Sequence, residues 1–299
     1  METIINHFHI NFIALFKLAR THHYIKNIFI FAPLFFALKL SDFMLLKQSI
    51  IAFIAFSLTA SAIYILNDFY DIETDKLHPI KKYRPLASGE IGKHQALSVM
   101  FILFTLGISL MGFISNEALL ILSFYIILNI TYTIFLKNIA ILDVITIAIG
   151  FVLRLFVGAA ATNITLSSWI VIMVFLLALF MALAKRRDDV LIFLNTGQNM
   201  RKVIQGYNLQ FLDSAMVIMA TVVIVTYTIY ITSLGGLLSQ ENSHYLYLTV
   251  LFVILGIMKY LQITFVLKDS GSPTKIILKN HFIQLTLVAW IATFFWILY

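Results

Sequence analysis

Residues 48–75 read QSIIAFIAFSLTASAIYILNDFYDIETD, an apolar run that ends in a cluster of acidic residues. Roughly 20 mostly apolar residues are enough to cross a bilayer, so residues 48–67 predict a transmembrane segment. Lipid offers the backbone no hydrogen-bonding partner, and a single span of this kind is therefore helical. The polar residues after position 67 mark the place where this helix leaves the membrane.

The acids at this helix end are spaced for one helical face. Asp68, Asp71 and Asp75 follow one another at intervals of three and four residues. Like charges so placed repel one another, and acids at a helix C-terminus also oppose the helix dipole. A bound cation would offset both costs, and Mg²⁺ prefers carboxylates and substrate phosphates as ligands. We predict that these three side chains are catalytic Mg²⁺ ligands and that Asn67 beside them binds substrate; the alternative is a solvated helix end.

The composition excludes a water-soluble protein. Hydrophobic residues make up 61% of the 299 residues and charged residues only 12%, whereas soluble domains carry about 25% charged residues. Cysteine is absent, which rules out a disulfide framework, a thiolate zinc site and a thiol nucleophile.

Further apolar segments extend this pattern along the whole chain, and no polar region of domain size remains. We predict an all-α polytopic membrane protein that forms a single domain over 1–299. The nine expected transmembrane helices cover about 27–46, 48–67, 94–114, 117–136, 141–162, 166–184, 214–237, 245–267 and 280–298. The longest polar stretches, 68–93 and 185–213, are expected to be loops.

The basic residues orient these spans. With nine helices, 17 of the 21 Lys and Arg residues fall on the side of the N-terminus, and only Lys39 and Lys47 fall on the other side. Lys and Arg are concentrated in cytoplasmic loops. We therefore expect a multi-pass protein of the cytoplasmic (inner) membrane, with its N-terminus and both long polar stretches in the cytoplasm.

Cations in both long polar stretches are candidates for phosphate binding. Arg84, next to Pro85, is expected to act in catalysis and substrate binding together with Lys81, since Arg and Lys pair with phosphate oxygens. Lys185 is expected to be catalytic as well, and Arg186 and Asp189 to contact substrate. The alternative for this second group is a basic cluster at the membrane interface, neutralised by its acids.

Two charged residues fall inside the predicted fifth span. Asp143 and Arg154 are 11 residues apart, or three helical turns, and so share a helical face. Charges at membrane depth cost several kcal/mol and usually mark a function or a pair. Arg154 could bind an anionic lipid headgroup or pair with an acid, and Asp143 could be interfacial. Lys26 and Asn27, just before the first span, could reach the site, although interfacial anchoring is the default for Lys26.

The segment Asn67-Asp68-x-x-Asp71-x-x-x-Asp75 resembles the first Asp-rich motif of the UbiA superfamily of intramembrane prenyltransferases. The predicted helix count and the cytoplasmic placement of the motif agree with that family. Membership would imply a UbiA-like helical bundle and an Mg²⁺-dependent transferase of a lipid substrate.

Within the superfamily, the chain is most similar to the decaprenyl-phosphate phosphoribosyltransferase (DPPR synthase) branch. That branch implies phosphoribosyl diphosphate as donor and a polyprenyl phosphate as acceptor, and Tyr132 and Lys137 complete the expected substrate-binding set. The segments that carry the resemblance are Ile25-Lys26-Asn27, Phe31-Ala32-Pro33-Leu34, His78-Pro79-x-Lys81-x-x-Arg84-Pro85-x-Ala87-Ser88-Gly89, Leu136-Lys137, Leu142-Asp143, Gly150-Phe151-Val152-Leu153-Arg154 with Gly158, Ala184-Lys185-Arg186 and Gly271-Ser272-Pro273-Thr274.

One departure from the parent family bears on the donor. Ordinary members show a second motif, D-x-x-x-D, whereas here Asp188 and Asp189 are adjacent and Ile192 and Phe193 follow. This favours the phosphoribosyl donor. The rival is a prenyltransferase that moves a polyprenyl group from its diphosphate to an aromatic or other acceptor. A transporter is a third reading, but no pair of Gly- or Pro-broken spans marks a midplane site.

Overall fold

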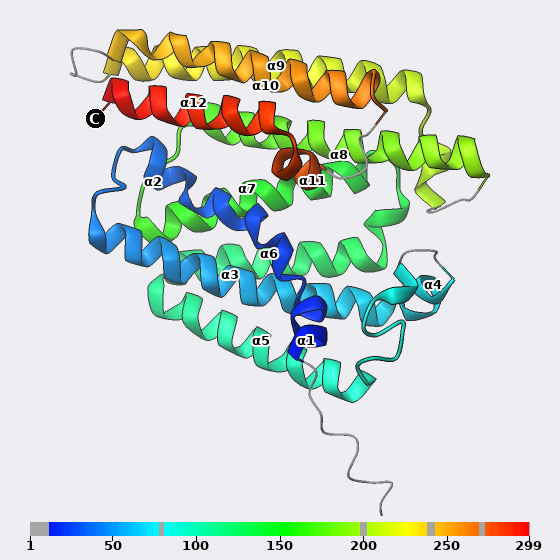
Figure 1. The fold of residues 1–299 in the computed structure, drawn as a ribbon. Helices are drawn as coiled ribbons and strands as arrows, with labels where there is room; N and C mark the ends of the chain where they lie inside the picture. Colours follow the sequence, from blue (N-terminus) through cyan, green and yellow to red (C-terminus); the bar gives the residue numbers. More distant parts are fainter. Residues whose placement is uncertain (1–11, 78–80, 198–201, 238–242, 269–272, 299) are drawn as a thin grey trace, which may run out of the picture. The chain divides into compact units, whose positions relative to one another are not determined.

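The computed structural model describes residues 12–77, 81–197, 202–237, 243–268 and 273–298 (Figure 1). The motif residues His78, Pro79, Gly271 and Ser272 lie outside these ranges. All regular secondary structure in the described ranges is helical, which confirms the predicted all-α class.

The chain divides into two compact units. Unit 1 comprises Met1–Ile134 and Leu153–Thr165, and unit 2 comprises Phe135–Val152 and Leu166–Tyr299. Helix α7 contributes residues to both. Each unit is described separately below.

Unit 1 is organised around α3, which packs along α5 (Figure 1). Its core consists of apolar side chains from several elements, including Phe56 of α3 and Leu122 of α6, both fully buried. Asp42 begins α3, because its carboxylate accepts hydrogen bonds from the backbone N–H groups of Met44 and Leu45. The helices of unit 1 are α1 (Phe12–Ala19), η2 (Thr21–Phe31), α2 (Ala32–Phe36), α3 (Phe43–Tyr70), α4 (Ile72–Lys76), η3 (Lys81–Tyr83), α5 (Lys93–Ile114), α6 (Asn116–Ile134) and the second half of α7 (Leu142–Thr162).

Unit 2 is built on two packed helix pairs, α8 with α9 and α10 with α12. Its core includes Phe180, Leu212 and Tyr260. The helices of unit 2 are η4 (Leu136–Asn138), the first half of α7, α8 (Ser168–Thr196), η5 (Lys202–Gly206), α9 (Leu209–Leu237), η6 (Ser243–Leu248), α10 (Thr249–Phe265), α11 (Pro273–Lys279) and α12 (His281–Leu298).

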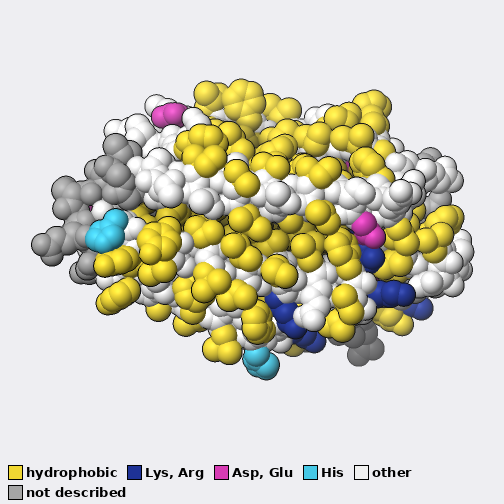
Figure 2. Space-filling model, turned by 90° about the horizontal axis from the view of Figure 1, so that it is seen from above, with side chains coloured by type: hydrophobic (Ala, Val, Ile, Leu, Met, Phe, Trp, Pro, Cys, Tyr) yellow, Lys and Arg dark blue, Asp and Glu magenta, His cyan; other side chains and the backbone are white. Residues whose placement is uncertain are grey.

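Eight helices in the described ranges are long and apolar enough to cross a membrane. Large apolar side chains lie open on their surfaces, such as Phe113 at 90% and Trp296 at 70% exposure. Hydrophobic side chains also predominate on the face shown in Figure 2, where Lys and Arg side chains are few. Apolar surface on this scale is stable in lipid and unstable in water, so the chain is an integral membrane protein.

The first predicted span, 27–46, is not one of these eight helices. Its residues are shared among the 3₁₀ helix η2, the short helix α2, a turn, and the start of α3. The turn contains Leu38 in the left-handed region, at φ 58°, and Asp42 starts a new helix. The prediction of one continuous helix over 27–46 was wrong, because hydropathy alone does not reveal a break in the backbone.

Helix α8 is longer than predicted. The expected span 166–184 is the beginning of a helix that continues to Thr196 and stops at Gly197, which has a left-handed φ of 69°. Lys185, Arg186 and Asp189 therefore lie within α8, and the prediction that they belong to a loop was wrong. An ion pair between Arg186 and Asp189, one turn apart, stabilises this extension.

Candidate functional site

Two of the three predicted metal ligands meet at one cation in unit 1. Arg84 Nη1 donates to Oδ1 of Asp68 at 3.0 Å and to Oδ2 of Asp75 at 2.6 Å. Both carboxylate residues are buried, at 2% and 3% exposure, at the end of α3 and in α4. A single positively charged nitrogen thus contacts both acids.

A break in the helix decides which acids meet. Helix α3 ends at Tyr70, and Asp71 forms its C-cap, with its N–H bonded to the carbonyl of Asn67. Helix α4 starts at Ile72, so the expectation of one continuous helical stripe through Asp75 was wrong. Asp71 is half-buried at the junction. Among the described residues, no three His, Cys, Asp or Glu side chains form a metal-binding group.

Arg20 is a second cation at this site, which the sequence reasoning missed. Its guanidinium forms an ion pair with Asp68 and lies 5.3 Å from the ring centre of Tyr64. The Arg20 backbone has φ 50° and ψ 45°, in the left-handed region. This conformation costs a non-glycine residue roughly 1–2 kcal/mol, and such strain gathers at functional sites. The pair joins residues 48 apart in the chain, so no local sequence motif could predict it.

Asn67 and Tyr132 lie close to the same helix end. Oδ1 of Asn67 accepts a hydrogen bond from Oγ1 of Thr133 at 3.3 Å. Tyr132, the residue before Thr133 on α6, is half-buried. The contact joins the Asn67 side chain to α6, and substrate binding by Asn67 and Tyr132 stays a prediction.

The donor set in unit 1 fits a divalent cation. Two buried carboxylates already share one cationic nitrogen, and Mg²⁺ commonly uses one or two carboxylates and completes its shell with substrate phosphate and water. Arg20 and Arg84 could turn to phosphate oxygens when a metal takes the carboxylates, because guanidinium groups bind both anions. Asp71 as a third ligand stays a prediction.

A second polar group in unit 1 surrounds Arg154; we name it the Arg154 cluster. Arg154 Nε donates to Oδ1 of Asn27 at 2.8 Å, and its Nη2 donates to the hydroxyl of Tyr125 at 3.0 Å. The rings of Phe56 and Tyr125 lie 5.1 and 5.0 Å from its guanidinium carbon. Asn27 in turn donates to Oγ of Ser57 at 2.9 Å. The cluster ties η2 to α3, α6 and α7.

Three of the charged residues predicted in unit 2, Asp143, Arg186 and Asp189, are joined through Arg186; with Tyr207 we name this group the Asp143 network. Arg186 Nε donates to Oδ2 of Asp143 at 2.5 Å, and its Nη1 pairs with Asp189. The hydroxyl of Tyr207 donates to Oδ1 of Asp143 at 2.6 Å and accepts from the N–H of Ile141 at 2.7 Å. Burial, followed by the bond to Asp143, raises the pKa of Tyr207 above its usual value. The sequence reasoning did not include Tyr207.

The other cations of this region differ in their surroundings. Arg187 Nε donates to Oδ1 of Asp213 at 2.6 Å, and its Nη1 donates to the carbonyl of Thr264 at 2.9 Å. Arg187 thus joins α8 to α9 and α10. Lys185 is exposed, and Lys137 on η4 is half-buried. The geometry favours a structural role for Arg186 and Arg187, and leaves Lys185 and Lys137 as the more accessible candidates.

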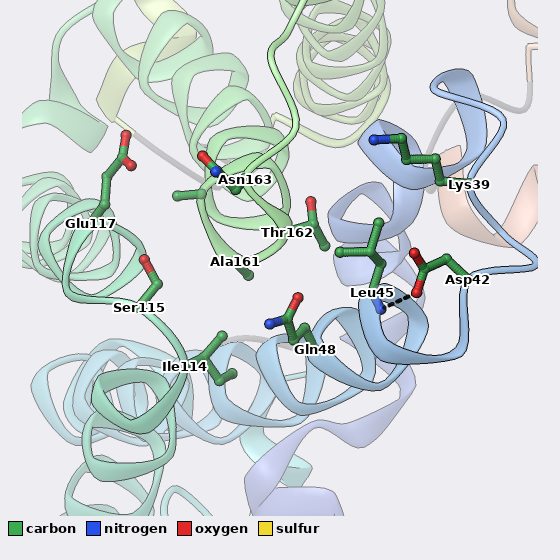
Figure 3. Close-up of a pocket in the computed structure, with 11 residues that line it drawn as sticks. Lys39, Asp42, Leu45, Gln48, Ile114, Ser115, Glu117, Ala161, Thr162 and Asn163 are labelled. Atoms are coloured by element: carbon green, nitrogen blue, oxygen red, sulfur yellow. Dashed lines mark hydrogen bonds between the residues drawn. The ribbon is translucent and has the colours of Figure 1, made fainter.

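Unit 1 also contains a cavity of about 640 Å³, at the end of α3 that is remote from Asp68 (Figure 3). Its lining includes Asp42, Gln48, Glu117 and Asn163. Asp42 and Asp68 are at opposite ends of α3, roughly 40 Å apart at 1.5 Å per residue. None of the predicted site residues lines this cavity, so it is not the predicted diphosphate site.

Comparison with known proteins assigns the class. Residues 28–286 match the UbiA prenyltransferase family. The fold agrees: a UbiA homologue from Archaeoglobus fulgidus, solved with DMAPP and Mg²⁺, superposes with a TM-score of 0.70 over 94% of this chain and 98% of its own, at 16% identity. The protein is a membrane transferase, and it belongs to the UbiA prenyltransferase family.

Relatives that align over more than nine-tenths of this chain share one name. The chain is 29% identical to the decaprenyl-phosphate phosphoribosyltransferase of Mycolicibacterium smegmatis, over 94% of this chain and 91% of the relative. It is also 29% identical to the protein of that name from Corynebacterium glutamicum, over 93% and 84%. These similarities confirm the predicted resemblance to that branch.

Proposed function

We propose that this protein transfers a 5-phosphoribosyl group from phosphoribosyl diphosphate to a polyprenyl phosphate. A phosphate oxygen of the acceptor forms a bond to C1 of the ribose, the bond from C1 to the diphosphate oxygen breaks, and diphosphate leaves with the bonding electrons. The acceptor is already anionic, so the step needs no protein nucleophile and no strong general base.

The observation that carries this proposal is the grouping of Asp68 and Asp75 with Arg84 and Arg20. Two acids and two guanidinium groups at one helix end are suited to a metal-bound diphosphate. The named relatives, which align over nearly the whole chain, support phosphoribosyl diphosphate as the donor.

The roles of the residues follow from their charges. Asp68 and Asp75 would hold Mg²⁺, with Asp71 as the predicted third ligand. When bound, the metal would neutralise charge on the donor diphosphate. Arg84, Arg20 and Lys81 would stabilise the negative charge that builds on the departing diphosphate. Lys26 or Arg154 would position the acceptor phosphate.

The site is proposed to face the cytoplasm of the cell, where a soluble sugar diphosphate would be available. Support comes from the distribution of Lys and Arg, because the polar segments after α3 and at the end of α8 are rich in these residues and such segments are typical of the cytoplasmic side. The protein would then be a multi-pass component of the cytoplasmic (inner) membrane.

The second candidate is transfer of a prenyl group from a prenyl diphosphate. It is favoured by the fold shared with UbiA homologues solved with DMAPP or GPP and Mg²⁺. The same carboxylates and arginines could bind that diphosphate. The two candidates differ in the donor, which can be tested directly.

The test uses purified protein with Mg²⁺, farnesyl phosphate as acceptor and labelled phosphoribosyl diphosphate as donor, and follows label entering the lipid fraction. Asp68→Asn and Asp75→Asn should each lower transfer by about 100-fold or more, by analogy with other electrostatic groups in active sites. They should also remove the Mg²⁺-dependent thermal stabilisation by phosphoribosyl diphosphate. Asp42→Asn is the matched control, because Asn caps a helix as well as Asp does.

Two results would overturn the proposal. One is full activity and unchanged Mg²⁺ response in both site variants. The other is transfer from a prenyl diphosphate to an aromatic acceptor with no transfer of the phosphoribosyl group, which would establish the second candidate.

A further inference from the structure

Lys26 stands out among the cations of unit 1. It lies on η2 and is half-buried. No hydrogen bond or ion pair joins its ammonium group to another residue that the structure describes. A half-buried ammonium group without an anionic partner is costly, and binding an anion would relieve that cost.

Two guanidinium groups lie near enough to act on Lys26. Burial lowers the pKa of Lys26 to about 8, and the positive charges of Arg154 and Arg20 contribute to the shift. Arg20 is paired with Asp68. Several cations held in one place create a positive potential that attracts an anion.

Arg154 is the rival for that anion, but its guanidinium is already surrounded. Asn27 and Tyr125 accept hydrogen bonds from it, and the rings of Phe56 and Tyr125 lie close to it. Only 5% of the residue is exposed. Binding a phosphate there would require the Arg154 cluster to open, whereas at Lys26 no hydrogen bond or ion pair to a described residue would have to break. Arg154 holds Asn27, the neighbour of Lys26, and so acts as a positioning residue.

The surface beside Lys26 suits a lipid. Ile25 and Ile28 are exposed on η2, at 36% and 59%, one 3₁₀ turn apart and therefore on the same side. Apolar side chains on the outside of a membrane protein contact hydrocarbon. A lipid whose chain lies along Ile25 and Ile28 would bring its headgroup to Lys26.

We propose that Lys26 binds the phosphate monoester of the lipid acceptor, and that Arg154 positions it through Asn27. This inference rests on the proposed function and decides between the two acceptor-binding residues considered there. The donor also carries a phosphate monoester, on the ribose, so the experiment must separate the two sources.

The experiment measures binding without turnover. Purified wild-type protein and the variants Lys26→Gln, Lys26→Arg and Lys47→Gln are titrated with farnesyl phosphate, with farnesol, and with phosphoribosyl diphosphate plus Mg²⁺. Lys26→Gln should weaken farnesyl phosphate binding by about tenfold or more, the usual effect of losing a charged hydrogen bond. Its affinities for farnesol and for phosphoribosyl diphosphate should stay within about twofold of wild type. Lys26→Arg should restore binding, and Lys47→Gln, on the exposed start of α3, should match wild type.

The pH dependence provides a second readout. Lys26 loses its charge as pH rises through its lowered pKa, so the affinity of wild type for farnesyl phosphate should fall between about pH 7 and 9. Lys26→Arg stays charged over this range and should show no such fall. The other titratable and charged groups in this part of unit 1 include Arg20, His22, His23, Tyr24, Tyr64, Asp68, Asp75, Arg84, Tyr125 and Arg154.

Unchanged farnesyl phosphate binding in Lys26→Gln would overturn the inference. So would a loss that falls on phosphoribosyl diphosphate instead, since Lys26 would then serve the donor. The folding of Lys26→Gln is checked by its thermal unfolding temperature, which should equal that of wild type. If the proposed function itself is wrong, wild-type protein will not bind phosphoribosyl diphosphate, and this result distinguishes the two failures.

Discussion

Arg186 and Asp143 form a fully buried ion pair, with Nε of the arginine 2.5 Å from Oδ2 of the aspartate and neither side chain more than 1% exposed. The pair joins the first turn of α7 to α8 within unit 2. Two charges in such a place are stable only together, because each would be costly to bury alone.

Asp143→Asn should therefore destabilise the protein strongly. The amide keeps the shape of the side chain but removes the charge that Arg186 pairs with at this position, and losing one member of a buried pair costs about 3–5 kcal/mol. Unfolding in detergent measures the change. Glu73→Gln is the control, because the pair between Glu73 and Lys76 is exposed and such pairs contribute less than about 1 kcal/mol. Equal stability of the two variants would contradict this account.

Tyr207→Phe tests the hydroxyl that bridges Asp143 and the Ile141 N–H. Removing it takes one hydrogen bond from the buried Asp143 carboxylate and one from the Ile141 N–H, at a cost of about 1–3 kcal/mol. The pKa of Tyr207 is raised in the folded state, so its contribution is complete below about pH 10 and is lost as pH rises above that value. The stability difference between wild type and variant should thus shrink from pH 8 to pH 11. Exposed Tyr83 is the control, and Tyr83→Phe should change stability at neither pH.

Gly158→Ala should separate α7 from η2. A Cβ atom at this position would lie 2.0 Å from the carbonyl oxygen of Ile30, which is backbone and cannot move by itself. Overpacking of this kind typically costs 1–3 kcal/mol. Gly112→Ala is the matched control, because the nearest atom to its Cβ would be a flexible Leu119 side chain at 3.6 Å. If both variants unfold at the same temperature, the close approach of α7 to η2 is not as described.

Arg84→Lys should reduce phosphoribosyl transfer although the charge is kept. An ammonium group lacks the planar fork of a guanidinium and is more strongly hydrated. Losing one charge-assisted hydrogen bond predicts a decrease of about 10- to 100-fold in kcat/KM for the donor. Arg20→Lys should act in the same direction, because Arg20 shares Asp68 with Arg84. Lys82→Arg, on the same short helix as Lys81 and exposed, is the control, and an equal loss there would contradict the assignment.

Hydropathy predicted most of the fold because a membrane span needs a long apolar run. The expected spans 94–114 and 141–162 differ from α5 and α7 by one residue at most. The same signal is silent about backbone breaks inside an apolar stretch. It therefore missed the turn at Leu38, which divides the first expected span, and the continuation of α8 beyond residue 184.

The candidate site was predictable where its residues are neighbours in sequence. Asp68, Asp75 and Arg84 were found from local spacing and meet in the structure. Arg20 and Tyr207 were not found, because their carboxylate partners are 48 and 64 residues away. The break at Asp71 was missed too, since helix spacing assumes that the helix continues. Arg186 as a substrate ligand stays a prediction, and its buried ion pair with Asp143 was not evident from the sequence because the two residues are 43 positions apart.

Helix α7 carries Asp143 in its first turn and Arg154 eleven residues later, each held by different partners. An α-helix rotates by about 100° per residue. Deleting or inserting one residue between the two would turn one of them away from its partners without altering any side chain. The segment should thus tolerate many apolar replacements but no change in length. The number of residues between Asp143 and Arg154 is therefore more constrained than the identities of those residues.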